Sequence, residues 1–156
     1  MKMQSDMIHE EICTYEVCKL AKKKGFPQEV SRWRDFTSPS RNYYNHKGEL
    51  NGDCLEIIKC ICRKEEVPIE LQTIAAPTQS LLQRWLREEK GVVIDVVLDW
   101  QYNIEAEEIR YQYRIGSKRR MTIEGRQTRG IVRDRYFATY ELALEDVLKY
   151  ALENLV

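Results

Sequence analysis

The strongest constraint on the fold is a change of hydrophobic period directly after Gly91. Between Val92 and Ile104, large apolar residues occupy every second position, and the same holds between Ile109 and Ile115. A period of two places these side chains on one face of a β-strand. The two segments therefore predict neighbouring strands that share one buried face.

Residues 105–108 have the length of an ordinary hairpin connection. A hairpin symmetric about them gives chemically sensible cross-strand pairs, whereas a slip of one residue would set apolar side chains against polar ones. We therefore predict the register that pairs Tyr102 with Tyr111, Trp100 with Tyr113, Leu98 with Ile115 and Asp99 with Arg114.

Three segments carry the capping residues and the apolar periodicity of α-helices. Thr14, Thr78 and Thr139 are the expected N-caps, and Gly25 and Gly91 suit the left-handed position that follows a helix. Apolar residues recur at helical spacing after each threonine, and Tyr140 belongs to the apolar face expected of the last helix. In the last predicted helix, which follows Thr139, the acidic residues are expected to be solvated: Glu145, Asp146 and Glu153.

The segment Leu55–Cys62 is compatible with two structures. Its isoleucines favour a buried strand, whereas Asp53 as a cap and an apolar face at Leu55 and Ile58 favour a short helix. We predict a strand, which would place Cys60 and Cys62 on the same face.

The order of these elements predicts an α+β fold. With a third strand over residues 131–137, the chain is expected to form a single two-layer domain over residues 1–156. Its antiparallel sheet would have about three or more strands, with helices packed on one face. Three segments are expected to be irregular: a flexible N-terminus at 1–11, an arm at 27–52 and a basic loop at 116–130.

Composition excludes several classes of protein. The 156 residues are 43% hydrophobic and 32% charged, which is ordinary for a globular chain. No apolar run approaches the roughly 20 residues of a membrane span, and residues 1–6 resemble neither a signal nor a transit peptide. We therefore expect a cytoplasmic protein without a membrane partner. Its five cysteines are an odd number, and we expect reduced thiols.

Two stretches carry a resemblance. The run from Ala76 to Glu88 reads APTQSLLQRWLRE, and Tyr140–Leu144 reads YELAL. Together with Cys13–Phe26, these segments resemble a family of small bacterial proteins encoded mostly in prophages and other mobile elements. The resemblance covers about a third of the chain and has no catalytic signature. It implies a phage-derived or horizontally moved gene.

Charge is balanced overall but not locally. The chain has 25 basic and 25 acidic residues. Between Arg110 and Arg135, however, the sequence has nine basic residues and two acidic ones, which gives a local net charge of +7. Acidic blocks of −4 at 99–108 and −3 at 140–155 flank this segment.

The basic segment supports three interpretations. Its cations pair with the flanking acidic blocks, or contact the phosphates of a nucleic acid, or bind an acidic protein. The candidate contact residues are Lys118, Arg119, Arg120, Arg126, Arg129, Arg133 and Arg135. A second patch mixes arginine with an aromatic residue and suits either recognition or anchoring of the arm: Arg32, Trp33, Arg34 and Arg41.

The parts needed for common enzyme chemistry are scarce. Only His9 and His46 are available, so a nucleophilic site would have to combine His46 with Cys54. The cysteines lack zinc-knuckle spacing, and no phosphate-binding glycine motif occurs. We expect no metal, no cofactor and no catalytic residues, with the cysteines acting mainly as small buried apolar groups.

The sequence thus predicts a non-enzymatic binding or accessory protein of a mobile element. Recognition would use the surface around residues 117–135 and bind a protein or a second copy of the chain. A nucleic-acid-binding protein that uses residues 117–135 on phosphates is the alternative, and a hydrolase ranks third.

Overall fold

A computed structural model describes residues 10–28, 42–53, 55–66, 68, 71–99, 109–117, 131–132 and 135–156. The helices are α1 (Tyr15–Lys23), α2 (Leu55–Cys62), α3 (Gln79–Glu89) and α6 (Tyr140–Asn154). The strands are β1 (Tyr43–Tyr44), β2 (Ile74–Ala75), β3 (Val92–Leu98), β4 (Tyr111–Ser117) and β5 (Ile131–Val132). The fold is α+β, as predicted: β3, β4 and β5 form an antiparallel sheet, and β1 pairs with β2.

The predicted threonine caps are confirmed. The hydroxyl oxygens of Thr14, Thr78 and Thr139 each accept a hydrogen bond from the backbone N–H three residues later, at 3.2–3.4 Å. At the end of α1, Gly25 has φ +92°, and the N–H of Phe26 returns to the carbonyl of Ala21 at 2.9 Å. Gly91 follows α3 with φ +68°. These local groups satisfy backbone polar atoms that the helix itself leaves unpaired.

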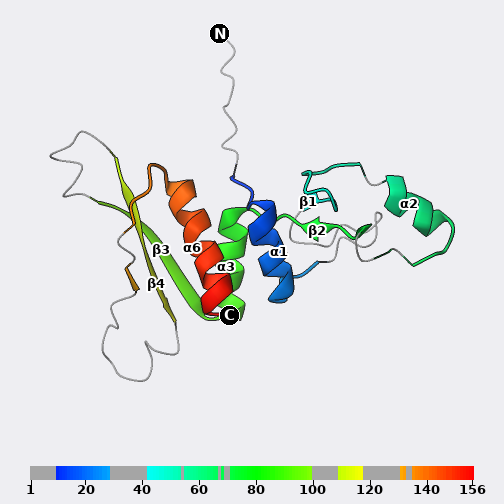
Figure 1. The fold of residues 1–156 in the computed structure, drawn as a ribbon. Coiled ribbons are helices and arrows are strands. Elements are labelled where there is room, and N and C mark those ends of the chain that lie inside the picture. Colours follow the sequence, from blue (N-terminus) through cyan, green and yellow to red (C-terminus); the bar gives the residue numbers. More distant parts are fainter. Residues whose placement is uncertain are drawn as a thin grey trace, which may run out of the picture.

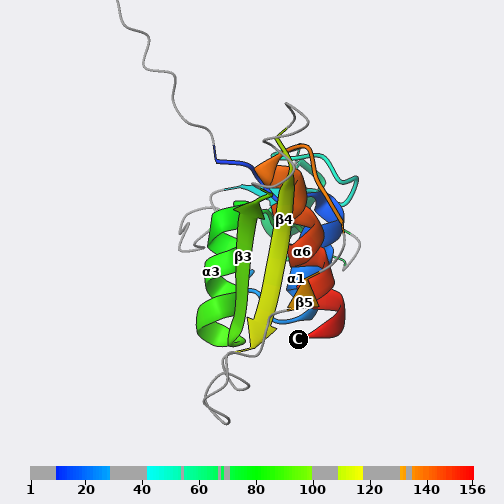
Figure 2. The ribbon, with the colours of Figure 1, turned by 90° about the vertical axis from the view of Figure 1, so that its left-hand side faces the viewer.

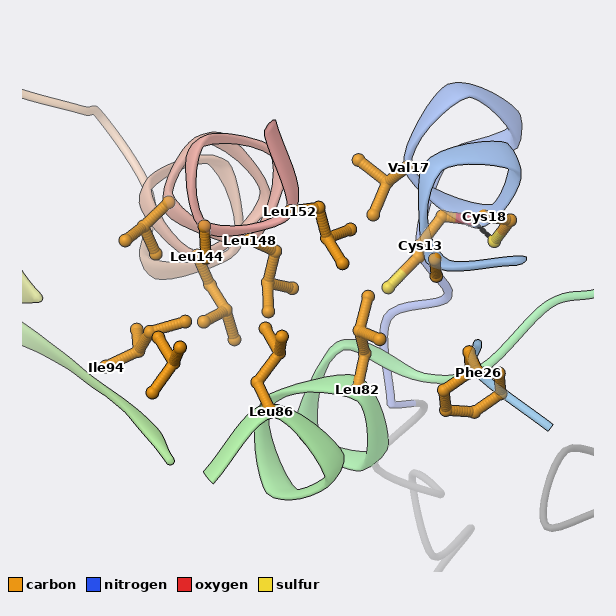
Figure 3. Close-up of a cluster of buried hydrophobic side chains, with 14 of the residues drawn as sticks. Cys13, Val17, Cys18, Phe26, Leu82, Leu86, Ile94, Leu144, Leu148 and Leu152 are labelled. Atoms are coloured by element: carbon orange, nitrogen blue, oxygen red, sulfur yellow. Dashed lines mark hydrogen bonds between the residues drawn. The ribbon is translucent and has the colours of Figure 1, made fainter. Parts of the chain in front are cut away.

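Helices α1, α3 and α6 run in the same direction; α3 and α6 cover one face of the three-stranded sheet, and α1 packs against α6 on the side away from the sheet (Figures 1 and 2). Leu144, Leu148 and Leu152 of α6 point toward Leu82 and Leu86 of α3 (Figure 3). Val17 of α1 and Ile94 of β3 complete this core, and all of these side chains are less than 10% exposed. Burial of apolar surface, at about 25 cal/mol per Å², is the main force that holds the layers together.

The predicted hairpin register is wrong. The observed pairs run from Val92 opposite Ser117 to Leu98 opposite Tyr111, which places Arg114 across from Asp95 rather than Asp99. The difference is four residues, an even number, so the same side chains face the core in both registers. Residues 100–108, including Trp100 and Tyr102, lie outside the described residues.

The predicted strand at Leu55–Cys62 is also wrong, because this segment forms α2. The carboxylate of Asp53 accepts the N–H of Leu55 at 2.9 Å, a cap that a strand would not need. Successive helical residues are 100° apart. Cys60 and Cys62 therefore lie on different sides of α2, not on one face.

Part of the predicted irregular arm is a compact hairpin. Tyr43 and Tyr44 pair with Ala75 and Ile74, and the chain then turns back so that Tyr44 bridges to Leu50. The predicted third strand, 131–137, is present as β5 next to β4 and as a separate bridge between Phe137 and Tyr111.

In the described part of the chain, no helix combines the length and apolar content that crossing a membrane requires.

Candidate functional site

The structure places one of the predicted contact residues, Arg135, on the surface. Its guanidinium lies 3.5 Å from the carboxylate of Asp146, and its side chain is 62% exposed. The other predicted contacts fall outside the described residues: Lys118, Arg119, Arg120, Arg126, Arg129 and Arg133, together with the second patch at Arg32, Trp33, Arg34 and Arg41.

The two ends of β4, the strand with which the basic segment starts, lie at opposite ends of the sheet. Ser117, where β4 ends, lies opposite Val92, whereas Tyr111, where β4 begins, lies opposite Leu98. At about 3.3 Å per residue, these two ends of β4 are about 20 Å apart. Arg110 therefore belongs to one end of the sheet, and the segment that follows Ser117 leaves from the other.

The first of these ends lies next to the start of α6 (Figure 1), and large side chains are exposed around it. Ile109 is 61% exposed, Tyr136 49% and Tyr140 40%. The guanidinium carbon of Arg110 lies 5.5 Å from the centre of the Tyr136 ring. We call the four residues around this end of the sheet the tyrosine–arginine surface: Ile109, Arg110, Tyr136 and Tyr140. Because side chains alternate along a strand, Arg110 and Tyr136 lie on the face away from Tyr111, whose ring meets Tyr140.

Backbone pairing holds the tyrosine–arginine surface together. Tyr111 and Phe137 exchange two backbone hydrogen bonds, at 2.9 and 3.0 Å, which fixes Arg110 beside Tyr136. The ring of Tyr140, the first residue of α6, meets the ring of Tyr111 edge to face at 6.2 Å between centroids. The surface is thus built on a strand, a bridge and a capped helix start, which orders its side chains before any partner binds.

Beneath this surface, a buried tyrosine is tied to an acid. Tyr113 is 1% exposed, stacks on Phe137 and donates its hydroxyl to the Asp146 carboxylate at 2.9 Å. Because the same carboxylate approaches Arg135, Asp146 links the core to the surface. The prediction that Asp146 is a solvated residue is therefore wrong.

Glu145 is also not a solvated residue. One of its carboxylate oxygens accepts the backbone N–H of Thr14, and the other accepts the side-chain amide of Gln79, both at 2.8 Å. Gln79 is 5% exposed and also donates to the carbonyl of Glu141 at 3.1 Å. Glu145 therefore connects the starts of α1 and α3 to α6, which is a structural role.

The described cysteines do not form a reactive or metal-binding centre. Cys13 and Cys18 are fully buried, and burial, with the carboxylate of Glu145 nearby, raises the pKa of both thiols. Among the described residues, no three histidine, cysteine or acidic side chains are placed to hold a metal ion. His46 is exposed in the turn after β1, and Cys54 lies outside the described residues.

Charges on the sheet are mixed rather than uniformly basic. Arg114 lies opposite Asp95 in the β3–β4 pair, and Arg135 is paired with Asp146. Acids that lie among the cations of a surface weaken its attraction for phosphate. Tyrosine and arginine beside exposed apolar area are instead typical of the centres of protein–protein interfaces.

Sequence reasoning missed the tyrosine–arginine surface because it assigned Tyr140 to the apolar core face of the last helix. Tyr136 and Ile109 belonged to no predicted site. A usable signal was present, since Tyr136 follows Arg135 and Tyr140 follows the helix cap at Thr139. Large apolar residues that flank a strand-to-helix connection, next to arginine, indicate a surface for recognition.

Comparison with protein-family models, with curated proteins and with solved structures finds no match to this chain.

Proposed function

We propose that this chain is a non-enzymatic binding protein that recognises another protein through the tyrosine–arginine surface. The observation that carries the proposal is the exposure of Ile109, Tyr136 and Tyr140 around the end of the sheet where Arg110 stacks on Tyr136, on a backbone that hydrogen bonds already hold in place. Removal of the exposed apolar part of these side chains from water would favour the complex by about 25 cal/mol per Å², against the cost of association.

The mixed charge of the same region supports a protein partner over a nucleic acid. Asp146 lies beside Arg135, and Asp95 lies across from Arg114, so a polyanion would meet acids as well as bases. The resemblance to prophage proteins supports the role of an accessory protein of a mobile element. In that context, the basic residues at 117–135 would attract an acidic partner and raise its rate of association.

Site-specific photo-crosslinking tests the proposal. A photo-reactive phenylalanine analogue at Tyr136 or Tyr140 is expected to give a discrete adduct with a second protein in the cell that encodes the chain. The matched control is the same analogue at Leu55, which is 56% exposed and lies in the distant lobe that holds α2 (Figure 1). Equal adducts at Tyr136 and Leu55, or none at either tyrosine, would contradict the proposal.

A mobility-shift assay separates the alternative. At about 50 mM salt, phosphate contacts are strong and weaken steeply as salt rises. We expect no shift of single- or double-stranded DNA or RNA. A salt-sensitive shift that disappears when Lys118, Arg119 and Arg120 are replaced by alanine would replace our proposal with nucleic-acid binding.

A further inference from the structure

Strand β3 is an edge strand of the three-stranded sheet, whose strand order is β3–β4–β5 (Figure 2). In an antiparallel pair, alternate residues direct both backbone polar groups toward the partner strand. Asp99 donates its backbone N–H to the carbonyl of Arg110 at 3.0 Å. The odd-numbered residues of β3 therefore direct their backbone polar groups toward β4. The N–H and C=O groups of the even-numbered residues therefore face away from β4: Val92, Ile94, Val96 and Leu98.

An independent contact confirms this direction. The side-chain amide of Gln83, on α3, donates to the carbonyl of Ile94 at 3.0 Å. That carbonyl thus bonds to a side chain where a neighbouring strand would otherwise supply its donor. Further along β3, toward Val96 and Leu98, no strand in the described part of the chain accompanies the edge.

Natural edge strands are usually short, or carry lysine, proline or a bulge that blocks further pairing. β3 is seven residues long, reads VVIDVVL and contains neither lysine nor proline. Its pairing with β4 is continuous from Val92 to Leu98, without a bulge. Asp95 is the one charged residue in the strand. β3 is therefore a regular edge strand that lacks these blocking features.

The position of Asp95 decides what kind of strand fits. On the β4 side, the residue across from Asp95 is Arg114, and Arg110 lies across from Asp99. A strand added on the other edge would place its own side chains beside the same aspartates, where basic residues are favoured. Two copies of β3, paired antiparallel about their midpoint, would instead set Asp95 against Asp95 of the second copy, which is unfavourable.

We propose that the free edge of β3 binds an extended peptide segment of a partner protein that carries lysine or arginine at alternate positions. Main-chain hydrogen bonds to Val96 and Leu98 would provide affinity, and Asp95 would select the charge of the segment. This surface lies on the opposite edge of the sheet from Phe137 and does not depend on the tyrosine–arginine surface.

Amide hydrogen exchange with synthetic peptides tests the proposal. The probe is an eight-residue peptide of alternating threonine and lysine, and its matched control alternates threonine and glutamate. With about nine-tenths of the protein bound, exchange at Val96 and Leu98 is expected to slow about tenfold with the lysine peptide. The amides of Asp95 and Val97, already bonded to β4, should not change.

Two variants and one control variant sharpen the result. D95K should reverse the preference, so that the glutamate peptide protects Val96 and the lysine peptide does not. V96P removes one edge N–H, a substitution that edge strands tolerate, and should abolish protection by either peptide. Y136A should leave the protection unchanged, which separates a failure here from a failure of the proposed function.

Three outcomes would overturn the proposal. Equal protection by both peptides would show that Asp95 does not select charge. Protection of Val96 that rises with protein concentration in the absence of peptide would show that a second copy occupies the edge. An absence of protection at millimolar lysine peptide would show that the edge does not pair.

Discussion

The carboxylate of Glu145 on α6 accepts the side-chain amide of Gln79, the first residue of α3, at 2.8 Å. Its other oxygen accepts the backbone N–H of Thr14 at the same distance. One acidic side chain thus joins the beginnings of two helices to a third. A buried donor that loses its acceptor costs free energy, because neither water nor another group replaces the bond.

From this arrangement, we expect E145A to lower the free energy of unfolding by about 1–2 kcal/mol, mainly because the buried side-chain amide of Gln79 loses one of its two acceptors. Urea denaturation followed by circular dichroism measures the change. The control is E153A on the exposed side of the same helix, which should stay within about 0.5 kcal/mol of the wild type. Similar losses in the two variants would contradict the linking role of Glu145.

Two glycines should respond very differently to alanine. A Cβ at Gly52 would lie 2.2 Å from the side-chain nitrogen of Asn45, which is 1% exposed and bonded within its own turn. We expect G52A to cost about 1–3 kcal/mol, because this turn must open to admit the methyl group. At Gly116 nothing lies within 4 Å of the added Cβ, so G116A should be neutral or slightly stabilising. Thermal unfolding of both variants distinguishes a tight site from an open one, and equal melting temperatures would contradict the packing at Asn45.

The buried cysteines should resist alkylation in the native protein. Burial raises the pKa of Cys18 to about 12 and also raises the pKa of Cys13, so neither thiol forms an appreciable thiolate at pH 8. Cys62 is exposed and should react with iodoacetamide before Cys13 and Cys18 do. Mass spectrometry after a short pulse, with and without denaturant, locates the label. Rapid native labelling of Cys18 would contradict the packing of α1.

We expect alkaline pH to destabilise the fold, because the pKa values of Cys18 and Tyr44 are raised in the folded protein. The pKa of Cys18 rises from 9.0 to about 12, and that of Tyr44, whose hydroxyl donates to the carbonyl of Cys13, rises from 10.0 to about 12. Because both groups ionise more readily in the unfolded chain, their contribution is complete below pH 9 and declines as the pH rises from 9 to 12. Denaturation at several pH values should show this decline, and Y44F should make it shallower above pH 10. An unchanged slope in Y44F would mean that Tyr44 ionises equally in both states.

Helix boundaries were predictable because they depend on neighbours in the sequence. Thr14, Thr78 and Thr139 bind backbone groups within one turn. The register of β3 and β4 was not predictable, because pairs such as Ile94 with Ile115 and Leu98 with Ile115 are equally apolar. The error came from centring the hairpin on residues 105–108, a choice that the alternation of apolar residues does not fix.

Polar residues in the folded core were missed for a related reason. Glu145 and Asp146 stand on a helix that is rich in acids, where a solvated carboxylate and a bonded one look the same in sequence. Their partners, Gln79 and Tyr113, are 66 and 33 residues away. The candidate site was only partly predictable, because Arg135 was identified but its tyrosine neighbours were assigned to the core or to no site.

The common direction of α1, α3 and α6 has a kinetic consequence. Parallel helices cannot be joined by a tight turn, so each returns to its neighbour only after a long excursion, through residues 24–78 and then 90–139. Helical proteins usually fold fast because their contacts are local. Here long loops must close before the helices meet, and the entropy cost of closing them slows folding. Despite its helical core, this chain should therefore refold at the pace of a protein dominated by sequence-distant pairing, and a stopped-flow chevron would show it.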